Sequence, residues 1–166
     1  MEQPRRHLYA VEGWGVGEIW VRGGRLLHHV LAGDDHALAE DPGAAAPRGG
    51  GPAVTLLRRR FAAHLRGRRV GYDDVEVELG ALTPFEQRLA DALRAVEWGS
   101  VVTYGELAAR AGRPGAARAA GGFCAAGGLS LVLPYHRVVG ADGIGGWGAA
   151  GPAVKRRLLA LEGVEV

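Results

Sequence analysis

The sequence predicts an α+β protein with a small N-terminal domain of β-sheet and helix and a C-terminal, all-helical domain of the winged-helix-like, helix-turn-helix kind. Three observations predict this. The 166 residues suffice for two small domains, short apolar runs alternate with glycine turns in the first half, and helix-capping motifs recur in the second. We place the boundary near Gly80, which gives domains at 1–80 and 81–166.

Strand-like patterns dominate the N-terminal domain. Residues 8–31 read as a strand pair or small meander, with Gly23-Gly24 as a hairpin turn. Residues 40–52 have the composition of a loop, and 53–66 show the apolar spacing of an amphipathic helix. Alternating valine and glutamate over 75–79 predicts one more half-buried strand.

Capping boxes punctuate the C-terminal domain. Thr83–Glu86 opens a helix that we expect to run toward Gly99, and Thr103–Glu106 opens a second, short helix. The remaining predicted elements are a third helix, an extended segment and a last helix, at Gly115–Ala126, Leu131–Leu133 and Pro152–Leu161. The tight turn between the second and third helices predicts a helix-turn-helix.

Composition narrows the function classes. No apolar run approaches the ~20 residues of a membrane helix, and residues 1–13 lack the core of a signal peptide, so we expect a cytoplasmic protein without membrane contact. Cys124 is the single cysteine, which excludes an internal disulfide and a multi-cysteine zinc site. Residues 101–140 carry four arginines against Glu106 alone, which favours a polyanionic partner.

The third predicted helix is rich in alanine and glycine over Gly115–Gly122. Few of its side chains can read base edges, but a smooth surface can enter the minor groove, which is only ~6 Å wide, and leave Arg118 to project. A tightly packed core helix would have the same composition, so both interpretations stay open at this point.

Four motifs together resemble the alkylguanine-DNA alkyltransferase family. They are Thr103–Ala108, Ala117–Ala119, Pro134 to Val138 with one departure, and Lys155 to Gly163. The resemblance covers Phe85 to Gly163, and residues 1–80 are similar only in pattern to the family's ribonuclease-H-like N-terminal domain. Family members move an alkyl group from the O6 atom of guanine onto their own cysteine.

The departure is Tyr135, which stands where the family has that cysteine. The resemblance is therefore to the alkyltransferase-like branch, whose members bind the lesion without repairing it and mark it for nucleotide excision repair. His136 and Glu162 match the family's proton relay. A phenol, with a pKa near ~10 against ~8.5 for a thiol, is a poor replacement nucleophile. We expect no catalytic residue here.

The resemblance also implies the DNA contacts. Arg118 falls at the family's arginine finger, which fills the gap left by a flipped base, and Tyr104 falls where a tyrosine crowds the phosphate. The full set of expected DNA-binding residues is Tyr104, Ala117, Arg118, Ala119 and Gly121. The expected lesion pocket consists of Tyr135, Arg137, Val138 and Trp147.

Further departures affect this pocket. Gly127 stands where the family usually has an asparagine hinge, and Gly145–Ala150 replaces a loop with a different aromatic and a serine. Small residues beside Trp147 predict tolerance of bulky alkyl groups. Cys124 lies outside the signature, and we expect it to be a packed residue.

Some relatives bind zinc in the N-terminal domain, but the candidate ligands here are histidines without cysteines, so we expect neither metal nor cofactor. These candidates are His7, His28, His29 and His36. We expect a monomer whose partners are duplex DNA with alkylated guanine and excision repair proteins. Two alternatives remain: an alkyltransferase with altered acceptor chemistry at Tyr135, and a general minor-groove binder.

Overall fold

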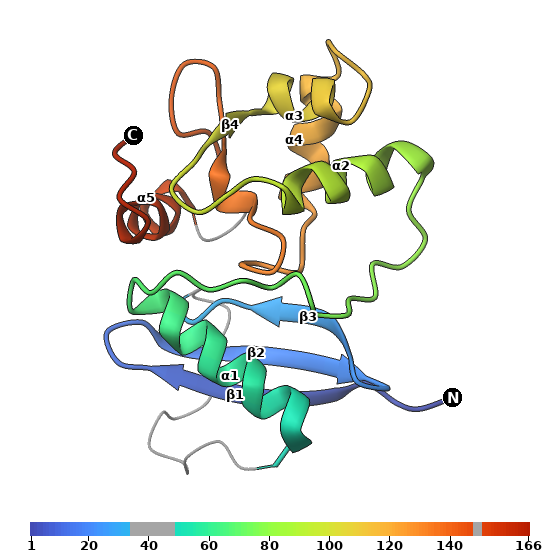
Figure 1. The fold of residues 1–166 in the computed structure, drawn as a ribbon, viewed down its shortest axis with the longest axis vertical. Helices are drawn as coiled ribbons and strands as arrows, with labels where there is room; N and C mark the ends of the chain where they lie inside the picture. The colour runs from blue at the N-terminus through green and yellow to red at the C-terminus, as the bar shows by residue number, and fades with distance from the viewer. Residues whose placement is uncertain (34–48, 148–150) are drawn as a thin grey trace. The chain divides into compact units, whose positions relative to one another are not determined.

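A computed structural model describes residues 1–33, 49–147 and 151–166 of the chain (Figure 1). It divides into two units, Met1–Glu78 and Leu79–Val166, each with its own buried interior. Sheet and helices are both present, which confirms the α+β class. The structure does not test the ribonuclease-H-like assignment of the first unit, which stays a prediction.

The N-terminal unit contains a three-stranded antiparallel sheet in the order β1-β2-β3. Its strands are β1 (Arg5–Val11), β2 (Gly15–Arg22) and β3 (Arg25–Val30). Gly23 and Gly24 both have positive φ, 55° and 79°, as a two-residue hairpin turn requires. The predicted meander is thus confirmed and begins slightly earlier than expected.

Helix α1 (Gly51–Leu65) lies along one face of this sheet (Figure 1). Its buried face, with Val54, Leu57 and Phe61, follows the predicted helical spacing. The predicted strand over 75–79 was wrong. Val77 makes only an isolated bridge to Leu26. The Leu26 N–H donates to the Glu76 carbonyl and the Glu78 N–H donates to the Leu26 carbonyl, and the pairing does not continue beyond these two hydrogen bonds.

The C-terminal unit contains four α-helices among its described residues: α2 (Pro84–Arg94), α3 (Tyr104–Arg110), α4 (Ala117–Ala125) and α5 (Gly151–Leu161). Both predicted capping boxes are present, at Thr83 with Glu86 and at Thr103 with Glu106. Helix α2 ends at Arg94, earlier than expected, and Val96 still packs in the interior. Helices α3 and α4 pack against each other across the turn at 111–116.

Two short parallel strands, β4 (Val102–Thr103) and β5 (Val138–Val139), also belong to this unit. The all-helical description of the domain was therefore wrong in this detail. Two residues per strand are too few for a sequence pattern, and the pairing joins segments far apart in the chain. The pair positions the start of α3 beside the end of the signature. No helix of the described residues is long and apolar enough to cross a membrane.

Candidate functional site

The signature segment forms a tight, buried turn. Tyr135–Arg137 is a single 3-10 turn, η2, that leads directly into β5. Before it, Leu131 adopts a positive φ of 72°, so the predicted extended segment Leu131–Leu133 is a buried turn instead. The Tyr135 N–H donates to the Leu133 carbonyl at 2.8 Å, and this bond fixes the entry into the signature.

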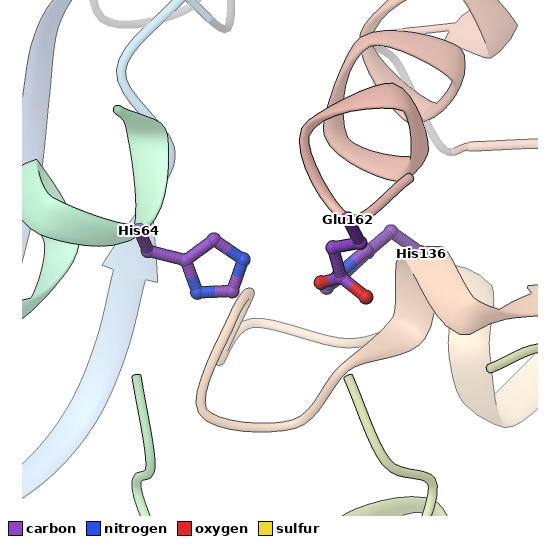
Figure 2. A group of neighbouring side chains, drawn as sticks. All are labelled: His64, His136 and Glu162. Carbon is purple, nitrogen blue, oxygen red and sulfur yellow. The ribbon is translucent and has the colours of Figure 1, made fainter. Parts of the chain in front are cut away.

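Glu162 is the centre of a buried polar network. His136 Nε2 donates to Glu162 Oε1 at 2.6 Å, and the two side chains point toward each other in Figure 2. Arg137 donates to both carboxylate oxygens, at 2.9 and 3.0 Å, and the Gly99 N–H donates to Oε2 at 3.0 Å. A carboxylate with this many donors is well compensated for its burial. The third side chain in Figure 2, His64, belongs to α1 of the N-terminal unit, where its Nδ1 lies 3.2 Å from the hydroxyl of Tyr72.

Arg137 has a different place from the one expected. Besides Glu162, its guanidinium donates to the Val96 carbonyl at 2.7 Å and lies over the Trp98 ring. The side chain is 7% exposed and engaged inside the domain. We therefore assign Arg137 to the support of Glu162 rather than to a pocket wall. Val138 is fully buried in β5.

The Tyr135 ring lies directly over Gly127. A Cβ atom added to Gly127 would stand 2.3 Å from Tyr135 Cζ and 2.6 Å from both Cε atoms. Phe123 of α4 lies on another side, with ring centroids 6.4 Å apart. The two departures from the family pattern are thus in contact. The ring occupies space that any side chain at 127 would need.

Burial makes the phenol of Tyr135 harder to ionise. It raises the pKa of Tyr135 well above the ordinary value, the nearby Cys124 raises it further, and the Leu129 backbone offsets only part of this. A phenol in this state is almost entirely protonated at neutral pH. His136 and Glu162 are in place as an oriented couple, but burial of the neighbouring phenol opposes its ionisation.

A second polar site in this unit is centred on Lys155. Lys155 of α5 is fully buried, and its Nζ donates to the Gly146 carbonyl at 3.1 Å and lies 5.6 Å from the Tyr104 ring centroid. Burial lowers the pKa of Lys155 to about 8. The family resemblance had included Lys155 without a site role. A usable signal existed, because it shares a helix face with Leu158, Leu159 and Glu162, all buried.

Cys124 lies near this lysine and behaves as a packed residue. Burial raises the pKa of its thiol to about 12, and Lys155 opposes the shift only weakly. The raised pKa disfavours the thiolate, so the single cysteine of the chain is a poor nucleophile where it lies.

The DNA-binding residues predicted from sequence gather at the start of α3 and on α4. Arg118 and Ala119 are exposed, Ala117 and Gly121 half-buried, and a Cβ on Gly121 would lie 3.9 Å from the Tyr104 ring. Within the described residues, Arg118 forms no ion pair. The surface of α4 is thus smooth with one projecting cation, and their contact with DNA stays a prediction.

Trp147 is half-buried and meets His136 edge-on, with centroids 6.2 Å apart, so an aromatic ring does flank the relay. Residues 148–150 of the same loop, and His36 of the candidate zinc set, lie outside the described residues. His29 is bound to the Tyr9 hydroxyl at 2.7 Å, and His28, its neighbour on β3, is exposed. No group of three potential metal ligands in the described part of the chain includes His7, His28 or His29.

The sequence is similar to a family of known proteins. Residues 84–164 match the family model of the 6-O-methylguanine DNA methyltransferase DNA-binding domain. The methylated-DNA–protein-cysteine methyltransferase of Salmonella typhimurium is 36% identical over 82% of this chain and 72% of its own length. The protein of the same name from Mycobacterium bovis is 40% identical over 83% of this chain and 77% of its own.

Solved structures agree. The OGT of Mycobacterium tuberculosis in complex with DNA superposes with a TM-score of 0.75 at 29% identity, over 95% of this chain and 92% of that one. The O6-methylguanine-DNA methyltransferase of Pyrococcus kodakaraensis gives a TM-score of 0.66 at 28% identity, over 98% of this chain and all of that one. The likeness thus extends through both units.

Proposed function

The chain belongs to the methylated-DNA–protein-cysteine methyltransferase family, and we propose that it is a non-catalytic sensor of O6-alkylguanine in duplex DNA. It binds through the minor groove, rotates the lesion into the pocket beside Tyr135 and Trp147, and marks the site for nucleotide excision repair. Membership of the family supports two parts of this proposal, the binding of DNA and a role in DNA repair. The tyrosine at position 135 supports a role without turnover.

One observation carries the proposal: the side chain at the acceptor position is a buried phenol and not a thiol. Tyr135 replaces the acceptor cysteine, and burial keeps its phenol protonated. The remaining thiol, Cys124, has a pKa raised to about 12. Alkyl transfer requires an ionised nucleophile aimed at the alkyl carbon. The site can hold an alkylated base without attacking it.

In this proposal, residues of α3 and α4 make the contacts with DNA. An inserted guanidinium from Arg118 stacks between bases and offsets the few kcal/mol of base extrusion. Tyr104, packed beside Gly121, supplies bulk where the resemblance places the target phosphate. Small residues on α4 let the helix backbone approach the groove closely.

Intact-mass spectrometry combined with binding tests the proposal. The protein is incubated with duplexes carrying O6-methylguanine or O6-benzylguanine, and its mass and the state of the guanine are measured. We expect an unchanged protein mass, an unrepaired base, and tighter binding to the lesion than to an undamaged duplex. A stoichiometric alkyl adduct on the protein refutes the sensor function.

The retained His136–Glu162 couple favours one alternative, an alkyltransferase in which Tyr135 Oη accepts the alkyl group. Tyr135→Phe is the matched variant, because it keeps the ring and removes the acceptor oxygen. For the sensor, both proteins bind the lesion equally and stay unmodified. For the enzyme, an adduct on the native protein disappears in the variant.

Arg118→Ala tests the flipping mechanism against a general minor-groove binder. We expect the ratio of lesion to undamaged affinity to fall about tenfold, since the finger offsets an extrusion that undamaged binding does not need. Arg110→Ala removes the same charge from α3, where Arg110 is also exposed, and serves as the control. Equal losses on both duplexes in Arg118→Ala favour the general binder.

A further inference from the structure

The outer side of α1 carries a hollow of about 590 Å³ within the N-terminal unit. Leu56, Arg59, Ala63 and Arg66 follow at helical spacing on the side opposite the buried residues, and Arg68 and Val70 close the hollow after the helix ends. Figure 1 shows that the other side of α1 rests on the sheet. We call this surface the α1 groove.

Its arginines differ in how they are satisfied. Arg60 forms a two-pronged ion pair with Asp74, at 2.7 and 2.9 Å, and Arg58 donates to backbone carbonyls. In contrast, Arg59, Arg66 and Arg68 are exposed, and none of them takes part in an ion pair within the described residues. Three guanidinium groups without an ion-pair partner among the described residues therefore line one hollow, although the basic and acidic residues of the whole unit are equal in number.

The floor of the groove is apolar. Leu56 is 43% exposed, one of the few large hydrophobic side chains that the described surface leaves open. Ala62, Ala63 and Val70 are half-buried beside it. An apolar floor rimmed by arginine is typical of a protein-binding surface, where arginine is enriched and a buried anchor supplies much of the energy.

We propose that the α1 groove binds an acidic segment of a partner protein that inserts an apolar side chain against Leu56. This deepens the proposed function and rests on it, because a sensor that repairs nothing needs a surface through which the marked lesion is passed on. Carboxylates of the segment pair with Arg59, Arg66 and Arg68, and its apolar anchor covers the floor.

The apolar floor favours a protein over a second DNA contact. Phosphate contacts need charge and hydrogen-bond donors and gain nothing from an exposed leucine. DNA binding would therefore depend on the arginines alone, whereas an anchored acidic segment depends on the arginines and on Leu56. This difference makes the two occupants distinguishable.

Fluorescence anisotropy on the full chain tests the proposal with three probes. The first is a labelled 15-residue amphipathic helix-forming peptide with Glu on one face and Leu on the other, the second replaces its Glu by Gln, and the third is an undamaged 15-base-pair duplex. The variants are Leu56→Gln and the pair Arg59→Gln with Arg66→Gln. The control, Arg5→Gln with Arg25→Gln, removes the same charge from exposed positions on the sheet.

We expect the Glu peptide to bind and the Gln peptide to bind at least tenfold more weakly. Leu56→Gln and the groove arginine pair each weaken the Glu peptide about tenfold, while the control stays within twofold. The duplex affinity is unchanged by all three. Absence of peptide binding, or equal losses in the groove and control variants, overturns the proposal.

A third result overturns it in a different way. If the groove arginine pair weakens the duplex while Leu56→Gln does not, the groove is a contact for the DNA backbone. The peptide titration needs no lesion, so a failure of lesion selectivity in the earlier experiments leaves it interpretable. Conversely, loss of the groove interaction leaves lesion binding by α4 intact.

Discussion

Substituting Gly127 by alanine tests whether Tyr135 and Gly127 depend on each other. The added methyl group would lie 2.3 Å from Tyr135 Cζ, whereas carbon atoms in contact normally stand about 3.5–4.0 Å apart. The shortfall is about 1 Å or more for three atoms of a rigid, buried ring. Overpacking of this kind costs about 1–3 kcal/mol, and we expect the free energy of unfolding to fall by that amount.

The backbone adds nothing to this cost. Gly127 does not have a positive φ, so alanine is compatible with its conformation. A compatible glycine-to-alanine change normally stabilises a protein by about 0.4–1 kcal/mol through the unfolded chain. In a Tyr135→Cys background, where the ring is absent, Gly127→Ala should therefore stabilise. The coupling energy between the two sites is then about 1.5–4 kcal/mol.

Equilibrium urea unfolding, followed by circular dichroism and tryptophan fluorescence, measures all four members of the cycle. Gly122→Ala, on α4 shortly before Gly127, is the control, since no atom lies within 4 Å of its added Cβ once the backbone of the helix itself is set aside. It should be neutral or stabilising. A Gly127→Ala protein as stable as Gly122→Ala, or a coupling energy near zero, refutes the steric argument.

Three further predictions concern the polar groups. Glu162→Gln breaks the buried pair with Arg137 and should cost about 3–5 kcal/mol in urea unfolding, against no change for the exposed Glu165→Gln. Burial lowers the pKa of Lys155 from 10.5 to about 8, so between these values the unfolded chain holds more protons and stability rises with pH. Relative to Lys155→Met, native stability should gain about 1–2 kcal/mol from pH 8 to 10, and parallel curves would contradict this. Iodoacetamide at pH 7.5 should modify native Cys124 roughly 100-fold more slowly than the unfolded chain, and similar rates would show an accessible thiolate.

Local signals were predictable from the sequence. The capping boxes at Thr83 and Thr103 depend on residues three apart, so the chain alone specifies where α2 and α3 begin. The alternation of apolar and acidic residues over 75–79 predicted a strand that does not form, because only Val77 pairs with a strand residue. An alternating sequence pattern indicates which side chains are buried. It does not indicate whether a neighbouring strand is available for pairing.

Contacts between distant segments were not predictable. Gly127 and Tyr135 both stood out as departures, but their collision depends on the turn at Leu131 that folds one over the other. The engagement of Arg137 likewise needed the Val96 carbonyl, which belongs to the segment after α2. The resemblance to a family identified the residues, and the packing showed which of them support others.

The carboxylate at the end of α5 joins three parts of the C-terminal domain: the signature turn, the segment that follows α2, and the helix itself. A protein that abandons chemistry still requires this junction to stay folded. The histidine, arginine and glutamate would then be retained in a protein without transfer activity because they stabilise its fold. A sequence that matches at the histidine, arginine and glutamate therefore shares the fold of this domain. The residue before the histidine is the one that distinguishes a protein able to repair guanine from one that only binds it.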